Sequence, residues 1–309
     1  MITPVCVGGL GNMLYQIAKA IALAKRDDSK YQINILDWRS EGYRFLPNKT
    51  INRDMMDYGG HPLPFFQDRP YSLFDIFPLL DRHHPALTCQ DLMSQCTHVY
   101  VCPDIADLHP SDFIREQVFG EVPPIGVGER VVIHGFFFSH LHYSDALPEV
   151  RQALTPATEI VQYTQKFFAQ LPKGKRTIGI HLRLNYGTDT FDQHGRSVLG
   201  GEWYERALKQ IPGWKEAYIL VVSSDPSKAK EILKGVTCTF VEGKPMFVDL
   251  FLLAACDDLV LSPSTFSMWA AILNPKVVGG TGKAVVSVST ITMHDRQLLV
   301  PSPCWIIID

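Results

Sequence analysis

The sequence predicts an α/β fold built on parallel sheets, and three observations support this. Residues 2–7 form a short β-type run that ends in a glycine turn, and a helix with apolar positions 14, 17, 18, 21 and 24 follows it. The second half of the chain alternates strands and helices cleanly, a rhythm typical of parallel sheets with helices on their faces. The 309 residues are 46% hydrophobic and 20% charged, so a substantial core is expected.

The chain is expected to divide into two α/β domains. Further strands are predicted over 31–36 and 130–138, and a helix is predicted over 156–171. The region 48–128 is rich in proline and aromatic residues and predicts irregular structure with short helices. A polar, proline-containing link at 172–176 marks the expected boundary. We therefore predict an N-terminal domain over 1–172 and a C-terminal domain over 173–309, with the tail packing back on the first domain.

Charge and composition exclude some partners and locations. The net charge of −3 gives no general attraction for nucleic acid or anionic membranes, so an anionic ligand has to be held by a few local groups. No signal peptide and no membrane helix is recognisable. The seven cysteines are odd in number and show no paired metal spacing, which fits free thiols in a reducing compartment. These features predict a soluble cytoplasmic protein without a membrane anchor.

The second half supplies the candidate ligand site. Its expected strands are 177–182, 217–223, 237–241 and 258–261, and its expected helices are 201–210, 226–234, 246–256 and 266–273. Ligands of such sheets bind beyond the carboxyl ends of the strands. The polar motifs of this half stand at those ends, so we expect them to gather at one edge of the sheet.

Two of these motifs suit a diphosphate. His181 and Arg183 alternate with apolar residues and lie on the same side of a strand end, where a guanidinium can chelate phosphate oxygens. The alternative is a surface arginine paired with a carboxylate beside a satisfied histidine. The hydroxyl-rich segment 262–269 directly precedes a helix, and helix starts bind anions. The alternative there is simple capping, in which Ser264 or Thr265 satisfies the free helix amides.

The remaining candidates are less specific. Asp225 precedes a proline and predicts a helix cap, with a ribose or base contact as the less favoured role. The glycine turn 8–11 lacks the third glycine of a dinucleotide fingerprint, because Leu14 stands there, so a tight turn and a binding loop remain equal alternatives. The histidines at 83, 84, 140 and 142 lack further ligands at metal spacing, and no metal site is expected.

Read in order, these segments resemble the α-1,2-fucosyltransferase family, and more distantly the α-1,6 and protein O-fucosyltransferases. The opening 8–16 is similar to that family's GGLGNQMFQYA start, and 134–139 is similar to its GYFQS segment. The tripeptide 181–183 fits the beginning of its H-x-R-R-x-D-Y motif. The segments 249–253, 264–271 and 274–275 resemble its D-L-x-L-M and SSFSWWGAxLNP blocks, and 301–307 resembles its tail.

The resemblance implies a GT-B architecture, in which two Rossmann-like domains face a central cleft. It also implies an inverting transferase that moves L-fucose from GDP-β-L-fucose to a glycan hydroxyl, forming an α-1,2 linkage, with no cofactor and no essential metal. By the resemblance, the donor diphosphate is held by His181, Arg183, Ser264, Thr265 and Phe266. The nucleoside is held by Asp225 and Asp249, and the cleft on the acceptor side is bordered by Gly9, Gly11 and Asn12.

The chain also departs from that family's pattern. Its second arginine is replaced by Leu184, its glycine by Asn185 and its aspartate by Tyr186. These losses beside the diphosphate weaken the donor site or change the sugar that it accepts. For the base that activates the acceptor hydroxyl, we expect Asp189 or Asp192 ahead of His194, with Arg183 stabilising the leaving diphosphate. A dissociative transition state that needs no strong base is the alternative.

Three rival functions remain open at this point. The first keeps the transferase and changes the donor to another GDP- or UDP-sugar. The second is a nicotinamide-dependent oxidoreductase, which the incomplete glycine fingerprint disfavours although Asp37 lies where an acidic ribose ligand is expected. The third is a non-catalytic relative that only binds nucleotide or glycan.

Overall fold

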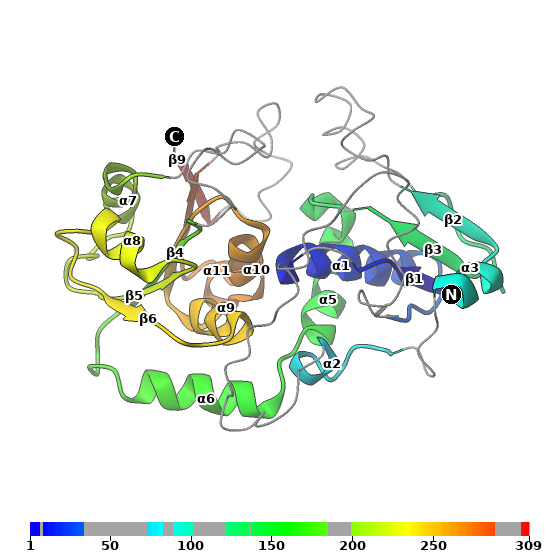
Figure 1. Cartoon of the computed structure of the whole chain (residues 1–309), viewed down its shortest axis with the longest axis horizontal. Helices are drawn as coiled ribbons and strands as arrows, with labels where there is room; N and C mark the ends of the chain where they lie inside the picture. Colours follow the sequence, from blue (N-terminus) through cyan, green and yellow to red (C-terminus); the bar gives the residue numbers. More distant parts are fainter. Residues whose placement is uncertain are drawn as a thin grey trace. The chain divides into compact units, whose positions relative to one another are not determined.

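A computed structural model describes residues 1–6, 9–33, 73–82, 89–101, 122–135, 137–184, 199–287 and 304–308. These residues form two compact units, with the change between them at Pro156 and Ala157. Each unit holds its own parallel sheet (Figure 1). The α/β class with a parallel sheet in each half is therefore confirmed. The second unit begins before helix α6 (Thr158–Ala169), whereas the sequence placed the boundary after it.

The first unit contains a three-stranded parallel sheet in the order β1-β3-β2, formed by Ile2–Pro4, Val131–His134 and His98–Val101. Isolated bridges join Ile2 to Tyr31 and Ile33 to Arg82, so the strand expected at 31–36 appears as bridging residues within its described part. The short strand β2 was missed by the sequence analysis. The other described elements of this unit are α1 (Leu10–Arg26), α2 (Leu73–Ile76), α3 (Cys89–Gln95), η3 (His140–His142), η4 (Ser144–Ala146) and α5 (Leu147–Ala153).

Strand β3 is shorter than the sequence predicts. It ends at His134, whereas the apolar run suggested a strand to residue 138. Phe137 has a φ of 50°, a left-handed conformation that cannot continue a strand. Its ring is buried instead in a core cluster with Ala20 of α1 and Ile133 of β3.

The second unit contains a six-stranded parallel sheet in the order β6-β5-β4-β7-β8-β9. Numbered from its first strand, this is the Rossmann order 3-2-1-4-5-6. The sequence order therefore reverses between β4 and β7, and a ligand is expected at that point. The strands are β4 (Thr177–Leu182), β5 (Tyr218–Ser223), β6 (Thr239–Val241), β7 (Asp258–Leu261), β8 (Ala284–Ser287) and β9 (Trp305–Ile308).

The last two strands belong to the second sheet. Strand β8 was not predicted from the sequence, and the tail was expected to pack back on the first domain. Residues 305–308 extend the second sheet, because Trp305 pairs with Ala284 and Ile308 pairs with Ser287. Runs as short as Ala-Val-Val-Ser carry too little period for a strand to be distinguished from a loop.

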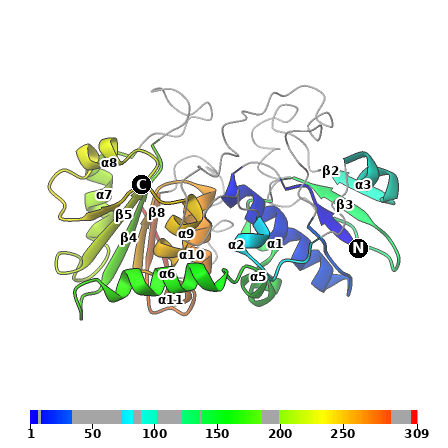
Figure 2. The same cartoon turned by 60° about the horizontal axis from the view of Figure 1, so that its bottom comes forward.

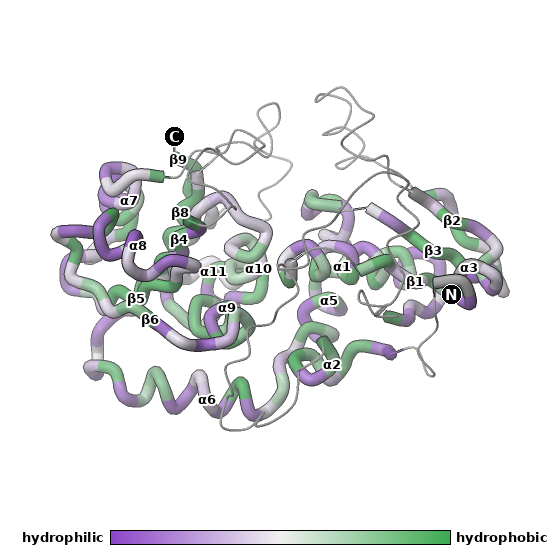
Figure 3. The backbone as a smooth tube through the Cα atoms, viewed as in Figure 1, coloured by the Kyte–Doolittle hydropathy of each residue, from purple (hydrophilic) through white to green (hydrophobic). Residues whose placement is uncertain are grey.

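Helices cover both faces of the second sheet (Figure 2). Helices α7 (Gly201–Leu208) and α8 (Pro226–Ile232) pack on the face that presents Ile178 and Ile180. Helices α9 (Met246–Ala255) and α10 (Thr265–Leu273) pack on the other, followed by α11 (Pro275–Val278). Figure 3 shows hydrophobic residues concentrated in these strands and in α9 and α10, whereas α6 alternates polar and apolar residues.

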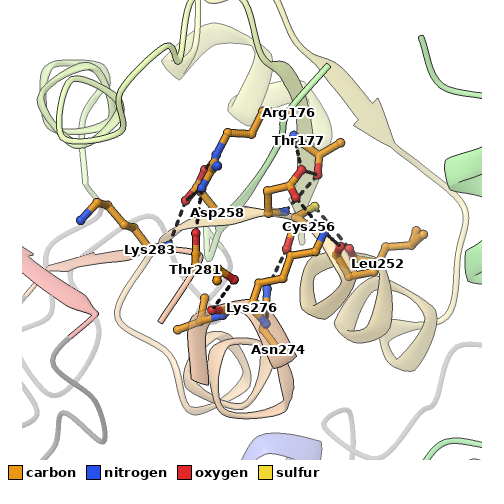
Figure 4. A network of polar contacts seen from close by, with 12 residues as sticks. Arg176, Thr177, Leu252, Cys256, Asp258, Asn274, Lys276, Thr281 and Lys283 are labelled. Atoms are coloured by element: carbon orange, nitrogen blue, oxygen red, sulfur yellow. Dashed lines mark hydrogen bonds and ion pairs between the residues drawn. The ribbon is translucent and has the colours of Figure 1, made fainter. Parts of the chain in front are cut away.

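The amino ends of β4 and β7 are joined by a polar network (Figure 4). The carboxylate of Asp258, which is fully buried, pairs with the guanidinium of Arg176 and also accepts the backbone N–H of Lys283 at 2.9 Å. Asp257 accepts hydrogen bonds from the backbone and hydroxyl of Thr177 and from Lys276 Nζ, each at 2.7 Å. This network lies at the opposite edge of the sheet from the strand ends that bear the candidate ligand site.

Candidate functional site

The candidate site lies at the carboxyl ends of β4 and its neighbours β5 and β7. Because parallel strands end at the same edge, His181 at the end of β4 and Arg183 directly after it meet the serine segment after β7. Ser262 N donates to the carbonyl of His181 at 3.1 Å, and Ser262 Oγ accepts the backbone N–H of Arg183 at 3.1 Å. The structure thus brings together two segments that the sequence analysis singled out separately.

His181 is buried and neutral. Burial lowers the pKa of its imidazole from 6.5 to about 3, and the nearby positive charge of Arg183 adds to this effect. Its Nδ1 lies 2.5 Å from Ser267 Oγ and 3.1 Å from Ser262 Oγ. Because Nδ1 faces these two hydroxyls, Nε2 is the ring nitrogen that remains for a ligand. A neutral ring contributes no positive charge to a diphosphate. The serine partners were not anticipated, although Ser262 and Ser267 stand in the segment that the sequence analysis identified.

The N-cap residue of helix α10 does not cap the helix through its side chain. Ser264 occupies the N-cap position and is 2% exposed, yet its hydroxyl makes no capping hydrogen bond. The capping explanation offered for Ser264 is therefore wrong. Phe266 packs against His181, with their ring centroids 5.1 Å apart. A helix start whose N-cap side chain makes no capping hydrogen bond, on the segment that contacts Arg183, is a chemically suitable place for a phosphate group, because its N–H groups and its dipole both favour negative charge.

Two acidic residues at the same edge have different surroundings. Asp225 is the N-cap of α8, where its Oδ1 accepts the Lys228 N–H at 3.0 Å, so its expected capping role is confirmed. Asp249 lies in the first turn of α9, and its Oδ1 is buried without a hydrogen-bond partner. Burial raises the pKa of the Asp249 carboxyl from 3.8 to about 8, with the positive charge of Lys244 opposing the shift. A buried carboxyl oxygen without a partner is costly unless a ligand satisfies it.

In the first unit, Gly9 and Gly11 lie at the start of α1. Gly9 is the N-cap, with φ −70° and ψ 169°, a conformation open to any residue. A side chain added at Gly9 would meet nothing within 4 Å. Local geometry therefore gives no reason for glycine at position 9, whereas Gly11 is buried within the helix and Asn12 is half-buried beside it. Of the two alternatives for this turn, the tight structural turn is not supported at Gly9.

Several predicted residues lie outside the described part of the chain. These include the candidate bases Asp189, Asp192 and His194, and the departures Asn185 and Tyr186. Leu184 is described: it is 7% exposed and belongs to the hydrophobic core cluster around β4. Within the described ranges, no group of three or more His, Cys, Asp or Glu side chains is arranged to hold a metal ion. No helix in those ranges is long and apolar enough to cross a membrane.

Three of the described cysteines, Cys6, Cys238 and Cys256, carry free thiols. Burial raises the pKa of the Cys6 and Cys256 thiols to about 12, so neither is a reactive thiolate at neutral pH.

Among solved structures, similarity is found to NodZ α-1,6-fucosyltransferase soaked with GDP-fucose, with 18% identity, 89% of this chain and 92% of that chain covered, and a TM-score of 0.49. POFUT1 in complex with GDP gives 15% identity, 92% and 97% coverage and a TM-score of 0.49. A mutant of Arabidopsis thaliana FUT1 in complex with GDP gives 15% identity, 92% and 70% coverage and a TM-score of 0.48.

The sequence comparisons are more specific. The O-antigen biosynthesis glycosyltransferase WbnK of Escherichia coli is 26% identical over 109 residues, which make up 32% of this chain and 34% of that protein. The match thus spans about a third of the curated relative's length. The model of glycosyl transferase family 11 matches residues 128–299, more than half of the chain, and this stretch contains the strand ends that carry His181, Arg183 and Ser262. The chain therefore belongs to glycosyl transferase family 11.

Proposed function

We propose that this protein is an inverting fucosyltransferase that moves L-fucose from GDP-β-L-fucose to a hydroxyl of an acceptor glycan, forming an α-1,2 linkage. The observation that carries the proposal is the contact of Arg183 with Ser262, in the segment that leads into α10, at the point where the strand order of the second sheet reverses. The N-cap of that helix, Ser264, makes no capping hydrogen bond. Membership of glycosyl transferase family 11 supports the reaction class. The fucose and the linkage rest on the resemblance of the sequence motifs.

The geometry supports a role for Arg183 and α10 in stabilising the leaving group. As the bond between fucose and the diphosphate breaks, negative charge develops on the phosphate oxygens. The guanidinium of Arg183 binds such oxygens in a bidentate manner, and the N–H groups at Ser264, Thr265 and Phe266 add oriented dipoles. His181 remains neutral, and we propose that it contacts the donor through its Nε2 edge, beside the arginine rather than as a second cation.

Asp249 supports guanine over other bases. Guanine offers two adjacent donors, N1–H and the N2 amino group, which match the two oxygens of one carboxylate. Uracil offers a single N–H flanked by two carbonyl oxygens, which would repel the second carboxylate oxygen. The buried Oδ1 of Asp249, which has no hydrogen-bond partner, is the acceptor that such a base would satisfy. We propose Asp249 as the guanine ligand and Asp225 as a secondary ribose contact.

The remaining roles are proposals from the sequence motifs. Gly9, Gly11 and Asn12 would border the acceptor side, and Asp189 or Asp192 would take the proton from the acceptor hydroxyl. The open space around Gly9 supports close approach of a ligand there. We further propose a glycan acceptor, no nucleic-acid partner, and transfer that needs no metal.

A donor screen tests the function. Purified protein is titrated with GDP, UDP and NAD, and the shift in melting temperature is recorded, because a ligand stabilises only the state that it binds. GDP should raise the melting temperature more than either alternative. Nucleotide release from GDP-fucose is then measured with several acceptor sugars, with and without EDTA. Stronger stabilisation by UDP or NAD would overturn the donor assignment, and activity that EDTA abolishes would overturn the metal-free reaction.

A further inference from the structure

The backbone directly after β4 lies beyond the regular hydrogen-bond ladder. The ladder pairs His181 with Leu261 of β7 and Leu182 with Ser223 of β5, and these are its last pairs. Both flanking strands then leave the sheet: β5 turns into the proline-led helix α8, and β7 turns at Pro263. The amides of Arg183 and Leu184 therefore extend past the last backbone carbonyls that the neighbouring strands offer.

Two serine hydroxyls take the place of those carbonyls. Ser262 Oγ, on the β7 side, accepts the N–H of Arg183 at 3.1 Å. Ser224 Oγ, on the β5 side, accepts the N–H of Leu184 at 3.1 Å. Consecutive amides of an extended strand point to opposite sides, so one residue from each flank is needed to hold both. The two serines extend the ladder by one residue on each side through their side chains.

We propose that Ser224 and Ser262 are positioning residues for Arg183, holding the backbone on both sides of its Cα so that the guanidinium is preorganised for the donor diphosphate. This inference rests on the proposed function. An arginine side chain that must be ordered on binding costs affinity, and a fixed backbone reduces that cost.

A third constraint comes from the neighbouring side chains. Leu182 is fully buried and Leu184 is 7% exposed, and both belong to the core cluster that includes Trp203 of α7. Leu184 occupies the position of the second arginine in the motif that this sequence resembles. Here that side chain anchors the strand end in the core. Arg183 lies between these two leucines, so its side chain is on the side of the strand end that faces away from this core cluster.

The experiment compares GDP with guanosine, because only GDP carries the phosphates that Arg183 would hold. Ser224→Ala and Ser262→Ala are prepared in the full chain, and dissociation constants are measured by calorimetry. Each variant should weaken GDP binding about three- to tenfold, the effect of one lost hydrogen bond, and leave guanosine binding unchanged. Ser224→Thr keeps the hydroxyl at an exposed position and should restore GDP affinity.

Two controls separate positioning from a general structural effect. Ser227→Ala changes an exposed serine of α8, three residues after Ser224, and should alter neither affinity. In an Arg183→Ala background, Ser224→Ala should have no further effect on GDP binding, because the residue through which it acts is gone. An equal loss in both backgrounds would overturn the inference, and so would equal weakening of GDP and guanosine.

The outcomes also distinguish this inference from the proposed function. If the wild-type protein prefers UDP or NAD to GDP, the proposed function fails. If the wild type binds GDP preferentially and both serine variants bind it as tightly, the positioning role alone fails. Ser224 is exposed, so its alanine variant is expected to fold even where the buried Ser262→Ala variant does not, and Ser224→Ala then decides the matter.

Discussion

The hydroxyl oxygen of Ser267 lies 2.5 Å from Nδ1 of His181, and both side chains are buried. The contact joins the end of β4 to helix α10, so the imidazole links the strand that precedes Arg183 to the first turn of that helix. A hydroxyl can donate to a neutral ring nitrogen, whereas a protonated ring in this position would have to lose its hydration without a carboxylate partner among the contacts described for it. The surroundings of His181 therefore favour the neutral ring in the folded state.

This relationship predicts a loss of stability in acid. The pKa of His181 is about 3 in the folded protein against 6.5 for the free side chain. The folded state thus excludes a proton that the unfolded chain binds, so the stabilisation is complete above pH 6.5 and is lost as the pH falls toward 3. By pH 5 the loss from this residue should be about 1–2 kcal/mol. Urea unfolding at pH 7.5 and pH 5 measures it.

His181→Asn serves as the non-titrating comparison. It should be less stable than the wild type at pH 7.5, because the ring packing against Phe266 is lost. The difference between the two proteins should shrink on acidification. A difference that stays constant from pH 7.5 to pH 5 would show that His181 does not titrate as its burial requires.

Asp249 predicts that guanosine binding weakens in acid. The pKa of its carboxyl is raised to about 8, so at pH 7 the unliganded protein holds it largely protonated. Pairing with the two guanine donors requires the carboxylate, and binding must therefore release a proton. Below pH 8, the affinity for guanosine should increase up to about tenfold per pH unit. Guanosine is the better probe because it has no phosphate that titrates in this range.

Asp249→Asn keeps the shape of the side chain and cannot ionise. It should bind guanosine weakly and with an affinity that does not change between pH 6.5 and 8. Because its folded-state pKa is raised, Asp249 also favours folding at low pH, and this stabilisation is lost as the pH rises through 8. The unliganded asparagine variant should therefore lose less stability than the wild type over that interval. Identical pH profiles for the two proteins would remove Asp249 from the nucleoside site.

Arg183 is the residue on which the proposed reaction depends most. Arg183→Ala should lower transfer from GDP-fucose by at least about a hundredfold, the loss typical of removing one stabilising group from a developing oxyanion. Its side chain is only half-buried, so the melting temperature should change little. Arg183→Lys keeps the charge but not the bidentate geometry and should recover a small part of the activity. Near-normal turnover in Arg183→Ala would exclude the diphosphate role.

The strand ends explain how much of the site could be predicted from the sequence. His181 and Arg183 were singled out because they alternate with apolar residues at the end of a predicted strand, which is a local signal. That the sheet is parallel then followed from the alternation of strands and helices. The contacts of Ser224 and Ser262 could not be foreseen, because they depend on register between strands that are about 40 and 80 residues apart in the chain.

Some helices and strands were predicted correctly and others were not, and this difference also depends on how much of each element's signal is local. Long amphipathic elements such as α1 and buried runs such as β4 carry enough period to be identified. Strand β3 was overextended because its apolar run continues through Phe137, whose positive φ depends on tertiary packing and not on local preference. Strands β8 and β9 were missed as strands of the second sheet because each has four residues and gains its stability from pairing.

Gly179 lies where β4 and helix α9 pack too closely for a larger side chain. A methyl group at this position would come within 3.0 Å of both Cys256 Sγ and Leu253 Cδ2, and within 3.1 Å of Leu259 Cδ2. The strand and helix α9 therefore approach each other at a distance that only glycine permits. Gly179→Ala should destabilise the protein by about 1–3 kcal/mol, the usual cost of overpacking a core. Gly200→Ala is the matched control, since a side chain there meets nothing within 4 Å. Equal urea midpoints for the two variants would contradict the close packing.

The ion pair at the far edge of the sheet should affect stability without affecting binding. Asp258 is fully buried, and its partner Arg176 reaches it from a half-exposed position. In Arg176→Ala the carboxylate keeps the Lys283 N–H but loses its counter-charge, which should cost about 3 kcal/mol. Lys209→Ala breaks the exposed pair with Glu205 and should cost less than about 0.5 kcal/mol. Because Arg176 lies at the amino ends of the strands, GDP affinity measured well below the unfolding temperature should be unchanged. A parallel loss of GDP affinity in Arg176→Ala would mean that the network at the amino ends of β4 and β7 also sets the geometry of the opposite edge.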